Sequence, residues 1–534
     1  MFADLVIQNG RLFTVDAQRP WAEAVACRDG VIRAVGTAAE IAPLIGPQTT
    51  VIDAGGRLVL PAFTDAHIHF LAYAQRRRQL ALFGERDLDR LLARVAAAAA
   101  QTPPGEWILG WGWDENLWDR SPLAADLDRV APHHLVALAR MDMHTWWVNG
   151  RALTLAGIDA QTPDPPESKI ERDADGRPTG LLREWNAIAL VEEQIPAPDE
   201  PALVQWAVET IAHLHQLGIA AIHDLRVERE GAQSLRVFQA LRARGQLDLR
   251  VHFQIAADFL PEAAALGLRP GFGDDRLWLG HVKAFADGTM GSHTAWMLEP
   301  FRDQPRNSGL VVTPPEELWQ LAQRAGEAGF SMAVHAIGDR AVREVIDVFS
   351  EYGATTGGQQ LSLPQRIEHV QLIHPDDLSR LAAAGIAASM QPVHLRTDWP
   401  TADAVWGERA RLAYAFQSLL AQETLLAFGS DAPVAPVNPM LGIHAALTRQ
   451  DEQQQPAGGW YPAEKMALAD IIRAYTLGPA IVAGKQAVQG SLTAGKWADI
   501  IILEQDLFAI PAAAVETAQV NTTIVAGKVV FTRS

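Results

Sequence analysis

The stretch LVLPAFTDAHIHF, residues 58–70, determines how this chain is interpreted. An apolar run leads into three polar residues, Asp65, His67 and His69, at spacings of two. Side chains in a strand alternate between its two faces, so these three would share a face if the run is a strand. The pattern is typical of half a metal site, but His-x-His also arises by chance among core or surface histidines. The rest of the chain has to decide between these alternatives.

The composition is that of a globular protein with a sizeable core. The chain has 534 residues, of which 48% are hydrophobic and 20% are charged. Its formal net charge of −18 repels phosphate backbones and anionic lipids, so nucleic acid and membrane surfaces are not expected partners. The single cysteine, Cys27, excludes an intramolecular disulfide. Since we find neither a signal-peptide pattern nor an apolar run of about 18 residues, we expect a cytoplasmic protein.

Both ends of the sequence contain short apolar segments separated by turn signals. Near the start, DLVIQNGRLFTV, AEAVACRDGVIRAVG and TTVIDAGGRLVLPAF contain NG, DG and GG, which favour hairpins. Near the end, GSLTAGKWADIIILEQD and TTIVAGKVVFTRS repeat this style. We therefore expect one small β-sandwich built from residues 1–57 and 481–534, with the middle of the chain inserted into it.

The middle of the chain alternates short apolar runs with helical patterns that have acidic starts and glycine at their ends. Such alternation indicates parallel βα units, and eight of them favour a closed barrel. We predict an α/β fold in which residues 58–480 form a (β/α)8 barrel, with its active site at the carboxyl ends of the strands. The eight predicted strands lie at residues 58–69, 218–225, 249–256, 277–288, 330–339, 365–372, 385–395 and 424–434.

Residues 75–210 interrupt this alternation. They contain an alanine-rich helical pattern, a tryptophan-rich segment and a proline-rich loop. We expect them to form an insertion after the first barrel strand that caps the barrel mouth. Tryptophan is more often a core residue, but several in such an insertion also fit an apolar or aromatic substrate group. Trp113 is the tentative substrate-binding residue among them.

Potential metal ligands lie at the ends of five of the eight predicted strands. In a closed barrel these ends meet at one mouth, so residues far apart in the sequence converge there. Nitrogen and oxygen ligands of these kinds suit zinc and similar ions. The predicted ligands are His67 and His69 on the first strand, Lys283 on the fourth, His335 on the fifth, His369 on the sixth and Asp431 on the eighth.

These motifs resemble those of the amidohydrolase superfamily of metal-dependent hydrolases. The order of the ligands along the chain and the sandwich split between the termini are both similar. The segments LPAFTDAHIHF, VKAFADGTMGSHTAW, VHAIGDRAV, RIEHVQ, SMQPVHL, GSDAPV and GSLTAGKWADIIIL look like the N-substituted formamide deformylase-like branch, amidohydrolase family 3. The resemblance runs from roughly residue 4 to residue 532, and the motifs are specific as a set although each is weak alone.

The resemblance implies one or two divalent ions, with zinc expected. With two ions, neutral Lys283 would capture carbon dioxide and bridge them as a carbamate; the alternative is a salt bridge to Asp287 or Asp431. Asp431 is expected to bind one metal, to accept the proton of the attacking water and to pass it to the departing nitrogen. The alternative for an aspartate in a GSDAP turn is backbone capping.

Four further residues are second-rank candidates. Asp65 shares a face with the histidine pair and is expected to orient one imidazole. His144 and His394 match polar positions in the family's substrate pocket, with a purely structural role as the alternative. His293 stands in GSHTAW, where related sequences usually read GSRTA, so the resemblance implies a less acidic substrate.

The sequence therefore predicts a hydrolase that cleaves a non-peptide carbon–nitrogen bond by a metal-activated hydroxide. The expected substrate is a small molecule, an amide or formamide with an apolar or aryl N-substituent. Ester, lactone or carbamate hydrolysis is the main alternative, because the metal-hydroxide chemistry is shared. A non-catalytic binding protein is a third alternative, which the presence of all six ligands disfavours. The resemblance also implies a homodimer.

Overall fold

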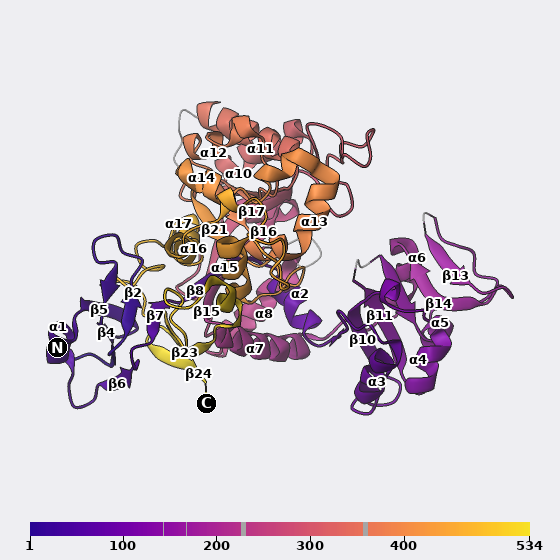
Figure 1. Cartoon of the computed structure of the whole chain (residues 1–534), viewed down its shortest axis with the longest axis horizontal. Helices are drawn as coiled ribbons and strands as arrows, with labels where there is room; N and C mark the ends of the chain where they lie inside the picture. The colour runs from indigo at the N-terminus through magenta and orange to yellow at the C-terminus, as the bar shows by residue number, and fades with distance from the viewer. Residues whose placement is uncertain (142–143, 167, 226–230, 356–360, 534) are drawn as a thin grey trace. The chain divides into compact units, whose positions relative to one another are not determined.

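The chain folds into two compact units, both drawn in Figure 1. Residues 1–73 and 207–534 form the barrel unit, and residues 74–206 form the inserted unit. Within the described part of the chain, no helix is long and apolar enough to cross a membrane. The computed structural model describes residues 1–141, 144–166, 168–225, 231–355 and 361–533.

A sheet of eight parallel strands forms the centre of the barrel unit, which confirms the predicted (β/α)8 barrel. Strands that follow one another along the chain are neighbours in the sheet. A parallel bridge between Ile68 and Ala432 joins its two edges. In order, the strands are β8 (Phe63–Ile68), β15 (Ile219–Asp224), β16 (Arg250–Ala256), β17 (Leu277–Phe285), β18 (Met332–Ala336), β19 (Arg366–His369), β20 (Ala387–Met390) and β21 (Leu426–Phe428).

Amphipathic helices separate the barrel strands along the chain. In α10 the buried residues recur at spacings of three and four from Leu318 to Ala325, so one stripe of the helix is buried. Pro315 and two glutamates occupy its first turn, where they favour helix initiation. The helices that begin beyond residue 199 are α7 (Glu200–Gln216), α8 (Gly231–Ala243), α9 (Leu260–Ala265), α10 (Pro315–Glu327), α11 (Asp339–Thr355), α12 (Arg380–Ala383), α13 (Leu395–Trp406), α14 (Phe416–Ala421), α15 (Pro439–Thr448), α16 (Leu468–Ala474) and α17 (Leu477–Val482).

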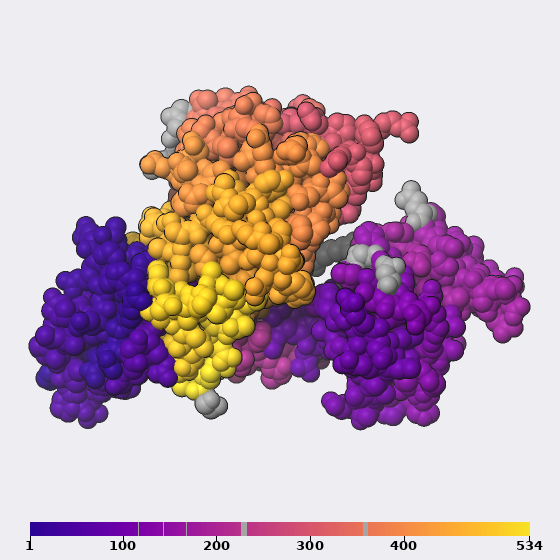
Figure 2. All heavy atoms as spheres, viewed as in Figure 1, coloured from indigo at the N-terminus to yellow at the C-terminus, as the bar shows by residue number. Residues whose placement is uncertain are grey.

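Two smaller sheets form the predicted sandwich from both ends of the chain. Strands from both sheets contribute to one hydrophobic cluster, which includes Ile7, Val59 and Ile500. The C-terminal residues, in yellow, lie directly against the indigo N-terminal residues in Figure 2. The first sheet is β5 (Val31–Gly36), β4 (Ala24–Arg28), β1 (Leu5–Gln8) and β6 (Thr50–Asp53); the second is β24 (Lys528–Thr532), β23 (Val520–Val525), β22 (Ile500–Leu503), β7 (Leu58–Pro61), β2 (Arg11–Phe13) and β3 (Trp21–Ala22).

The stretch at residues 58–70 is two strands, where the sequence suggested one. β7 pairs with β22 and β2 in the sandwich, whereas β8 belongs to the barrel. Adjacent backbone N–H groups show the change of partner: Ala62 donates to the carbonyl of Asp499, and Phe63 donates to that of Gly218. The apolar part of this stretch is buried in both the sandwich and the barrel. The sequence therefore gives no local signal of the point where the chain passes from one sheet to the other.

A register shift in the pairing of β16 with β17 turns Lys283 into the barrel. Trp278 and His281 are three residues apart, yet both rings contact the ring of His252, with centroids 5.7 and 5.5 Å away. In a regular strand, residues three apart face opposite sides. Beyond this bulge, Lys283 shares the inward face with His281, two residues before it.

The inserted unit is built on a six-stranded sheet of its own. Hydrophobic clusters include residues from this sheet and its helices, among them Trp113, Trp147 and Ile188. Its predicted position as a cap over the barrel mouth stays a prediction. The sheet order is β13 (Lys169–Arg172), β14 (Pro178–Arg183), β12 (Thr145–Val148), β11 (Leu135–Arg140), β10 (Trp107–Trp113) and β9 (Leu80–Ala81), with helices α3 (Leu88–Ala99), α4 (Ala124–Val130), α5 (Gly150–Leu155) and α6 (Trp185–Glu192).

A buried ion pair ties the barrel to the sandwich. Arg250 of β16 has a fully buried side chain, and its Nε and Nη2 donate to the Asp499 carboxylate at 2.6 and 3.0 Å. Its Nη1 also donates to Asp275 at 3.0 Å, but the Asp275 side chain is 49% exposed. The buried partner therefore contributes most to holding this arginine.

We expect Asp499→Asn to lower the free energy of unfolding by about 3 kcal/mol, because it leaves a buried guanidinium without its buried partner. Asp275→Asn is the matched control, and its cost should stay below about 1 kcal/mol because the Asp275 carboxylate is half-exposed and Arg250 keeps its buried partner Asp499. Urea denaturation of the three proteins measures both values. Equal costs for the two variants would contradict this account.

Candidate metal centre

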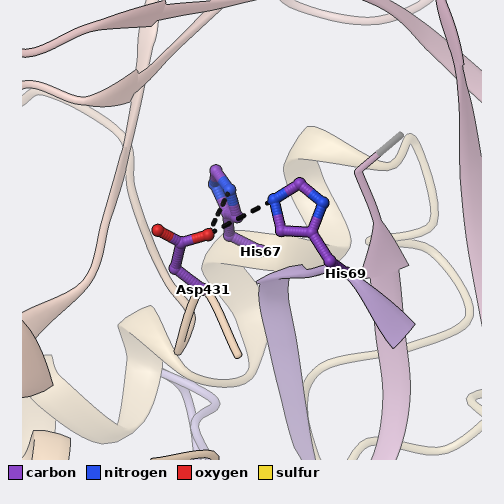
Figure 3. Close-up of side chains that lie close together, drawn as sticks. All are labelled: His67, His69 and Asp431. Atoms are coloured by element: carbon purple, nitrogen blue, oxygen red, sulfur yellow. Dashed lines mark ion pairs between the residues drawn. The ribbon is translucent and has the colours of Figure 1, made fainter. Parts of the chain in front are cut away.

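Three of the predicted ligands converge at the mouth of the barrel (Figure 3). Asp431 Oδ1 lies 3.2 Å from His67 Nε2 and 3.4 Å from His69 Nε2. These three residues each offer a ligand atom, and the atoms all lie within 4.8 Å of one another. Two imidazole nitrogens that face one carboxylate oxygen form a donor set that suits a divalent cation such as zinc.

Backbone hydrogen bonds bring these side chains together. The Asp431 N–H donates to the His67 carbonyl at 2.7 Å, and the His69 N–H donates to the Ala432 carbonyl at 2.9 Å. A Cβ at Gly429 would lie 2.4 Å from the His67 backbone nitrogen, so this close approach requires glycine. The first and last strand ends are therefore held together just where the ligands are placed.

Asp65 does not orient an imidazole, which corrects the prediction for it. Its Oδ1 accepts the backbone N–H groups of His67, at 3.1 Å, and of Ser430, at 3.0 Å. Burial raises the pKa of Asp65 to about 6. Its role is to join the backbones of the two ligand-bearing segments, which a period-two pattern cannot reveal.

The electrostatics of the site favour cation binding. Burial would raise the pKa of Asp431, but His67 and His69 hold that pKa well below its usual range, so the carboxylate stays ionised. Burial lowers the pKa of His335 to about 3 and that of His369 well below its usual value. Both imidazoles are therefore neutral at pH 7, which is the form that binds metals.

His335 and His369 lie next to this group. The His369 ring centroid is 4.9 Å from that of His67 and 4.5 Å from that of His335. His335 Nε2 lies 2.9 Å from the Gly288 carbonyl, which can only accept, so Nε2 carries the hydrogen and Nδ1 has the lone pair. The predicted strand assignments are correct for both residues, which lie on β18 and β19.

Lys283 has the surroundings of a reactive amine. Its side chain is buried, and its Nζ has no hydrogen-bond partner among the described residues. Burial lowers the pKa of Lys283 to about 8. The predicted alternative of a salt bridge to Asp287 fails, because that carboxylate accepts backbone N–H groups of Trp296, Ile337 and Gly338 instead.

Sequence reasoning missed the residues that contact the far side of His67. Glu368 Oε2 lies 2.7 Å from His67 Nδ1, and Arg366 pairs with the same carboxylate. Burial would raise the pKa of Glu368, but Arg366 and His67 hold it well below its usual range. The motif RIEH could have identified these two residues. It contains two opposite charges at a spacing of two in a buried strand, and such a pattern predicts an internal ion pair.

The tentative substrate-binding residues have different surroundings. His394 lies beside the site, with its Nε2 3.7 Å from Asp431 Oδ2. His293 lies in the loop after β17, where its Nε2 is 2.9 Å from Asp303 Oδ2. The role of each residue in binding substrate stays a prediction.

Two more of these candidates belong to the inserted unit. His144 Nδ1 lies 2.9 Å from Glu184 Oε2. Trp113 is 1% exposed, and its indole N–H donates to the Leu138 carbonyl at 2.7 Å. The surroundings of Trp113 are those of a core residue, which the sequence left as the commoner alternative for these tryptophans.

A second group of histidines fills the barrel interior. His223, His252 and His281 come from three adjacent strands, with neighbouring ring centroids 4.7 and 5.5 Å apart. Burial lowers the pKa of His281 to about 3 and the pKa values of the other two well below the usual value. Because Arg366 donates to His223 Nδ1 at 3.0 Å, its positive charge disfavours a second cation here.

A parallel eight-stranded barrel with a convergent group of possible metal ligands at its mouth is the architecture of a metal-dependent hydrolase. Residues 50–531 match the model of the Amidohydrolase family, and the chain belongs to that family. The chain is 27% identical to the N-substituted formamide deformylase of Arthrobacter pascens, with 94% of each chain covered. It is 34% identical to Protein LONG AFTER FAR-RED 3 of Arabidopsis thaliana, over 94% of this chain and 87% of that protein.

A solved structure supports the same class. A metal-dependent hydrolase of Pyrococcus furiosus, described as uncharacterised, superposes with a TM-score of 0.77 at 27% identity. The superposition covers 94% of this chain and 99% of that one. The resemblance seen in the sequence is therefore confirmed at the level of family and fold.

We expect His69→Asn and Asp431→Asn to bind less metal than the wild type, because each removes one of the three convergent ligand atoms. Metal content after dialysis against zinc, followed by metal-free buffer, measures this loss. The controls are His133→Asn and Asp29→Asn. They make the same two substitutions at exposed residues outside the site, so their zinc content should equal that of the wild type. Wild-type zinc content in both site variants would contradict the assignment of these ligands.

The buried histidines also predict acid sensitivity. Because their pKa values are lowered by folding, the unfolded chain binds more protons once the pH falls below about 6.5. The contribution of these histidines to stability is therefore complete above that pH and is lost as the pH falls toward the pKa values of His281, about 3, and His215, about 4. Each such histidine contributes up to about 1.4 kcal/mol per pH unit to the slope.

Urea unfolding at several pH values between 7 and 5 measures this slope. His215→Gln should make the slope shallower, because Gln does not titrate and its side-chain amide can still donate to the Asp248 carbonyl. The exposed His133→Gln is the control and should leave the slope unchanged. Equal slopes for the wild type and His215→Gln would refute the prediction.

Proposed function

We propose that this protein hydrolyses a non-peptide carbon–nitrogen bond in a small-molecule amide or N-substituted formamide, with zinc as its metal. The observation that carries the proposal is the ionised Asp431 carboxylate, which faces two imidazole nitrogens at 3.2 and 3.4 Å. The similarity to a deformylase that acts on N-substituted formamides supports the choice of bond.

Five side chains besides Asp431 would hold the metal: His67, His69, Lys283, His335 and His369. A bound divalent ion supplies acidity to water and polarises the substrate carbonyl. The unpartnered Nζ of Lys283 supports carbamate formation at this residue when two ions are present. In that step the amine nitrogen bonds to the carbon of carbon dioxide and releases one proton.

Asp431 moves the proton in the proposed reaction. Its ionised carboxylate accepts a proton from the attacking water and then donates it to the departing nitrogen. Oδ1 faces His67 of β8 and His69 just after it, whereas Oδ2 lies 3.7 Å from His394 Nε2. We therefore assign His394 to the side of the Asp431 carboxylate that faces the substrate, where it orients the departing amine.

The surface beside Lys283 supports an apolar or aryl substituent on the substrate. A cavity of about 640 Å³ there is lined by Lys283 and by the charged Asp258, Glu317 and Arg324, and its apolar part is formed by residues that include Ala256, Phe285 and Val312. Pockets of this size accept drug-sized ligands. In this proposal, His293 contributes a further polar contact to the substrate.

The proposal also places the enzyme in the cytoplasm as a homodimer. The reducing compartment is supported by Cys27, the single cysteine, which is buried. Analytical ultracentrifugation of the purified chain measures its oligomeric state.

The direct test measures amine release from N-substituted formamides and acyl amides, and acid release from matching esters, with zinc-loaded and chelator-stripped enzyme. We expect turnover that depends on metal and favours amides. Asp431→Asn should lower kcat at least about 100-fold, because it removes the group that moves the proton. Asp29→Asn, on the sandwich surface, should leave kcat unchanged.

Faster hydrolysis of esters or lactones would replace the proposed bond while keeping the metal site. Full activity of chelator-stripped enzyme would overturn the role of the metal. Metal binding without turnover of any substrate class would favour the binding-protein alternative.

A further inference from the structure

Glu368 lies inside the barrel and contacts a proposed ligand from across the sheet. It belongs to β19, and its side chain is fully buried. Its Oε2 is 2.7 Å from Nδ1 of His67, on β8. An ionised carboxylate can only accept hydrogen bonds, so Nδ1 of His67 is the donor in this contact.

This contact determines which nitrogen of His67 can bind a metal. With the hydrogen on Nδ1, a neutral His67 presents the lone pair of Nε2 toward Asp431 Oδ1, 3.2 Å away. His69 Nε2 faces the same oxygen at 3.4 Å. Acceptor atoms that converge in this way are stable only around a cation, either a proton or a metal.

A competing partner for Nδ1 is already in place. The side-chain nitrogen of Gln391 lies 3.2 Å from His67 Nδ1 and 3.3 Å from the Ser389 carbonyl. Since a carbonyl only accepts, the NH2 group of Gln391 faces that carbonyl, and therefore His67 as well. Without Glu368, this NH2 group would donate to Nδ1 and move the imidazole hydrogen to Nε2, where it blocks metal binding.

Arg366 holds Glu368 in this position. Its Nη2 donates to Oε2 at 3.0 Å, and its Nε forms an ion pair with Oε1 at 2.5 Å without the geometry of a hydrogen bond, so the guanidinium contacts both carboxylate oxygens. The same guanidinium donates to the Ala66 carbonyl at 2.8 Å, to Ser389 Oγ at 2.7 Å and to His223 Nδ1 at 3.0 Å. These partners come from three other strands, so the pair is fixed by the barrel itself.

We propose that Glu368, held by Arg366, is a positioning residue that keeps the hydrogen of His67 on Nδ1 and so keeps Nε2 available for the metal. The inference rests on the proposed function, because it presumes that His67 binds metal through Nε2. Glu368 itself does not touch the substrate or the reacting atoms.

The first measurement is zinc affinity, by competition with a chromogenic chelator. We expect Glu368→Gln to weaken zinc binding about 10- to 100-fold, as is usual for loss of the partner of a metal-binding histidine. Turnover at saturating zinc should show a lower kcat with little change in KM. Glu464→Gln is the matched control, because Glu464 is a buried glutamate that accepts from the Ser418 backbone, outside this network.

A second variant keeps the test valid if Glu368→Gln fails to fold. Arg366→Met with Glu368→Met removes both charges of the pair, so no unpaired charge is buried. The double variant should fold and still bind zinc weakly. In the metal-free proteins, ¹⁵N NMR of the imidazoles should show a hydrogen on Nδ1 of His67 in the wild type, whereas in the double variant Nδ1 should carry none and the hydrogen should be on Nε2.

The outcomes separate this inference from the proposed function. If the folded double variant has wild-type zinc affinity, or keeps a hydrogen on Nδ1 of His67, the proposed role of Glu368 is overturned. The proposed metal centre is not affected by that result. A wild-type protein that binds no zinc would overturn the proposed metal centre, and the inference with it. Because affinity and tautomer are measured without substrate, a wrong assignment of the cleaved bond would affect neither result.

Discussion

The junction between β8 and the segment after β21 is the constraint on which the site depends. The N–H groups of Asp431 and His69 bond across it to carbonyls of the opposite segment, and Asp65 binds the backbone on both sides. Ser430 and Asp65, which meet here, are 365 positions apart in the chain. The hydrogen bonds that close the barrel are therefore the same ones that set the positions of three of its proposed metal ligands.

The interior of the barrel beneath this junction is polar, which is costly for a protein core. A buried ion pair such as Arg366 and Glu368 loses hydration that its mutual attraction only partly restores. Here Nη1 and Nη2 of the guanidinium also donate to acceptors on three other strands, which offsets part of this cost, while Arg366 Nε and Glu368 Oε1 have no hydrogen-bond partner among the described residues. Such a network specifies one arrangement of the strands more than it stabilises the fold, and it supports the histidine nearest to Asp431.

Local patterns account for most of what the sequence predicted correctly. Each barrel strand is an apolar run followed by a turn or helix signal, and each proposed ligand lies at or near the end of such a run. Local sequence patterns do not predict that Lys283 faces the barrel interior. A register shift in β17 brings it inward, and pairing with a neighbouring strand decides that shift. The same limit explains the break at Ala62 and the true partner of Asp65, because both depend on which distant segment supplies the hydrogen-bond partner.

The sequence by itself determined the family, the barrel with its terminal sandwich, and the residue types available for a metal. These properties follow from hydrophobic periodicity and from side-chain chemistry, which are local. Only the tertiary structure decided which oxygen faces which nitrogen, that Glu368 bonds His67, and that Asp65 bonds backbone instead of imidazole. Most of those contacts join segments that lie far apart in the sequence, and only the folded sheet brings them within hydrogen-bond distance.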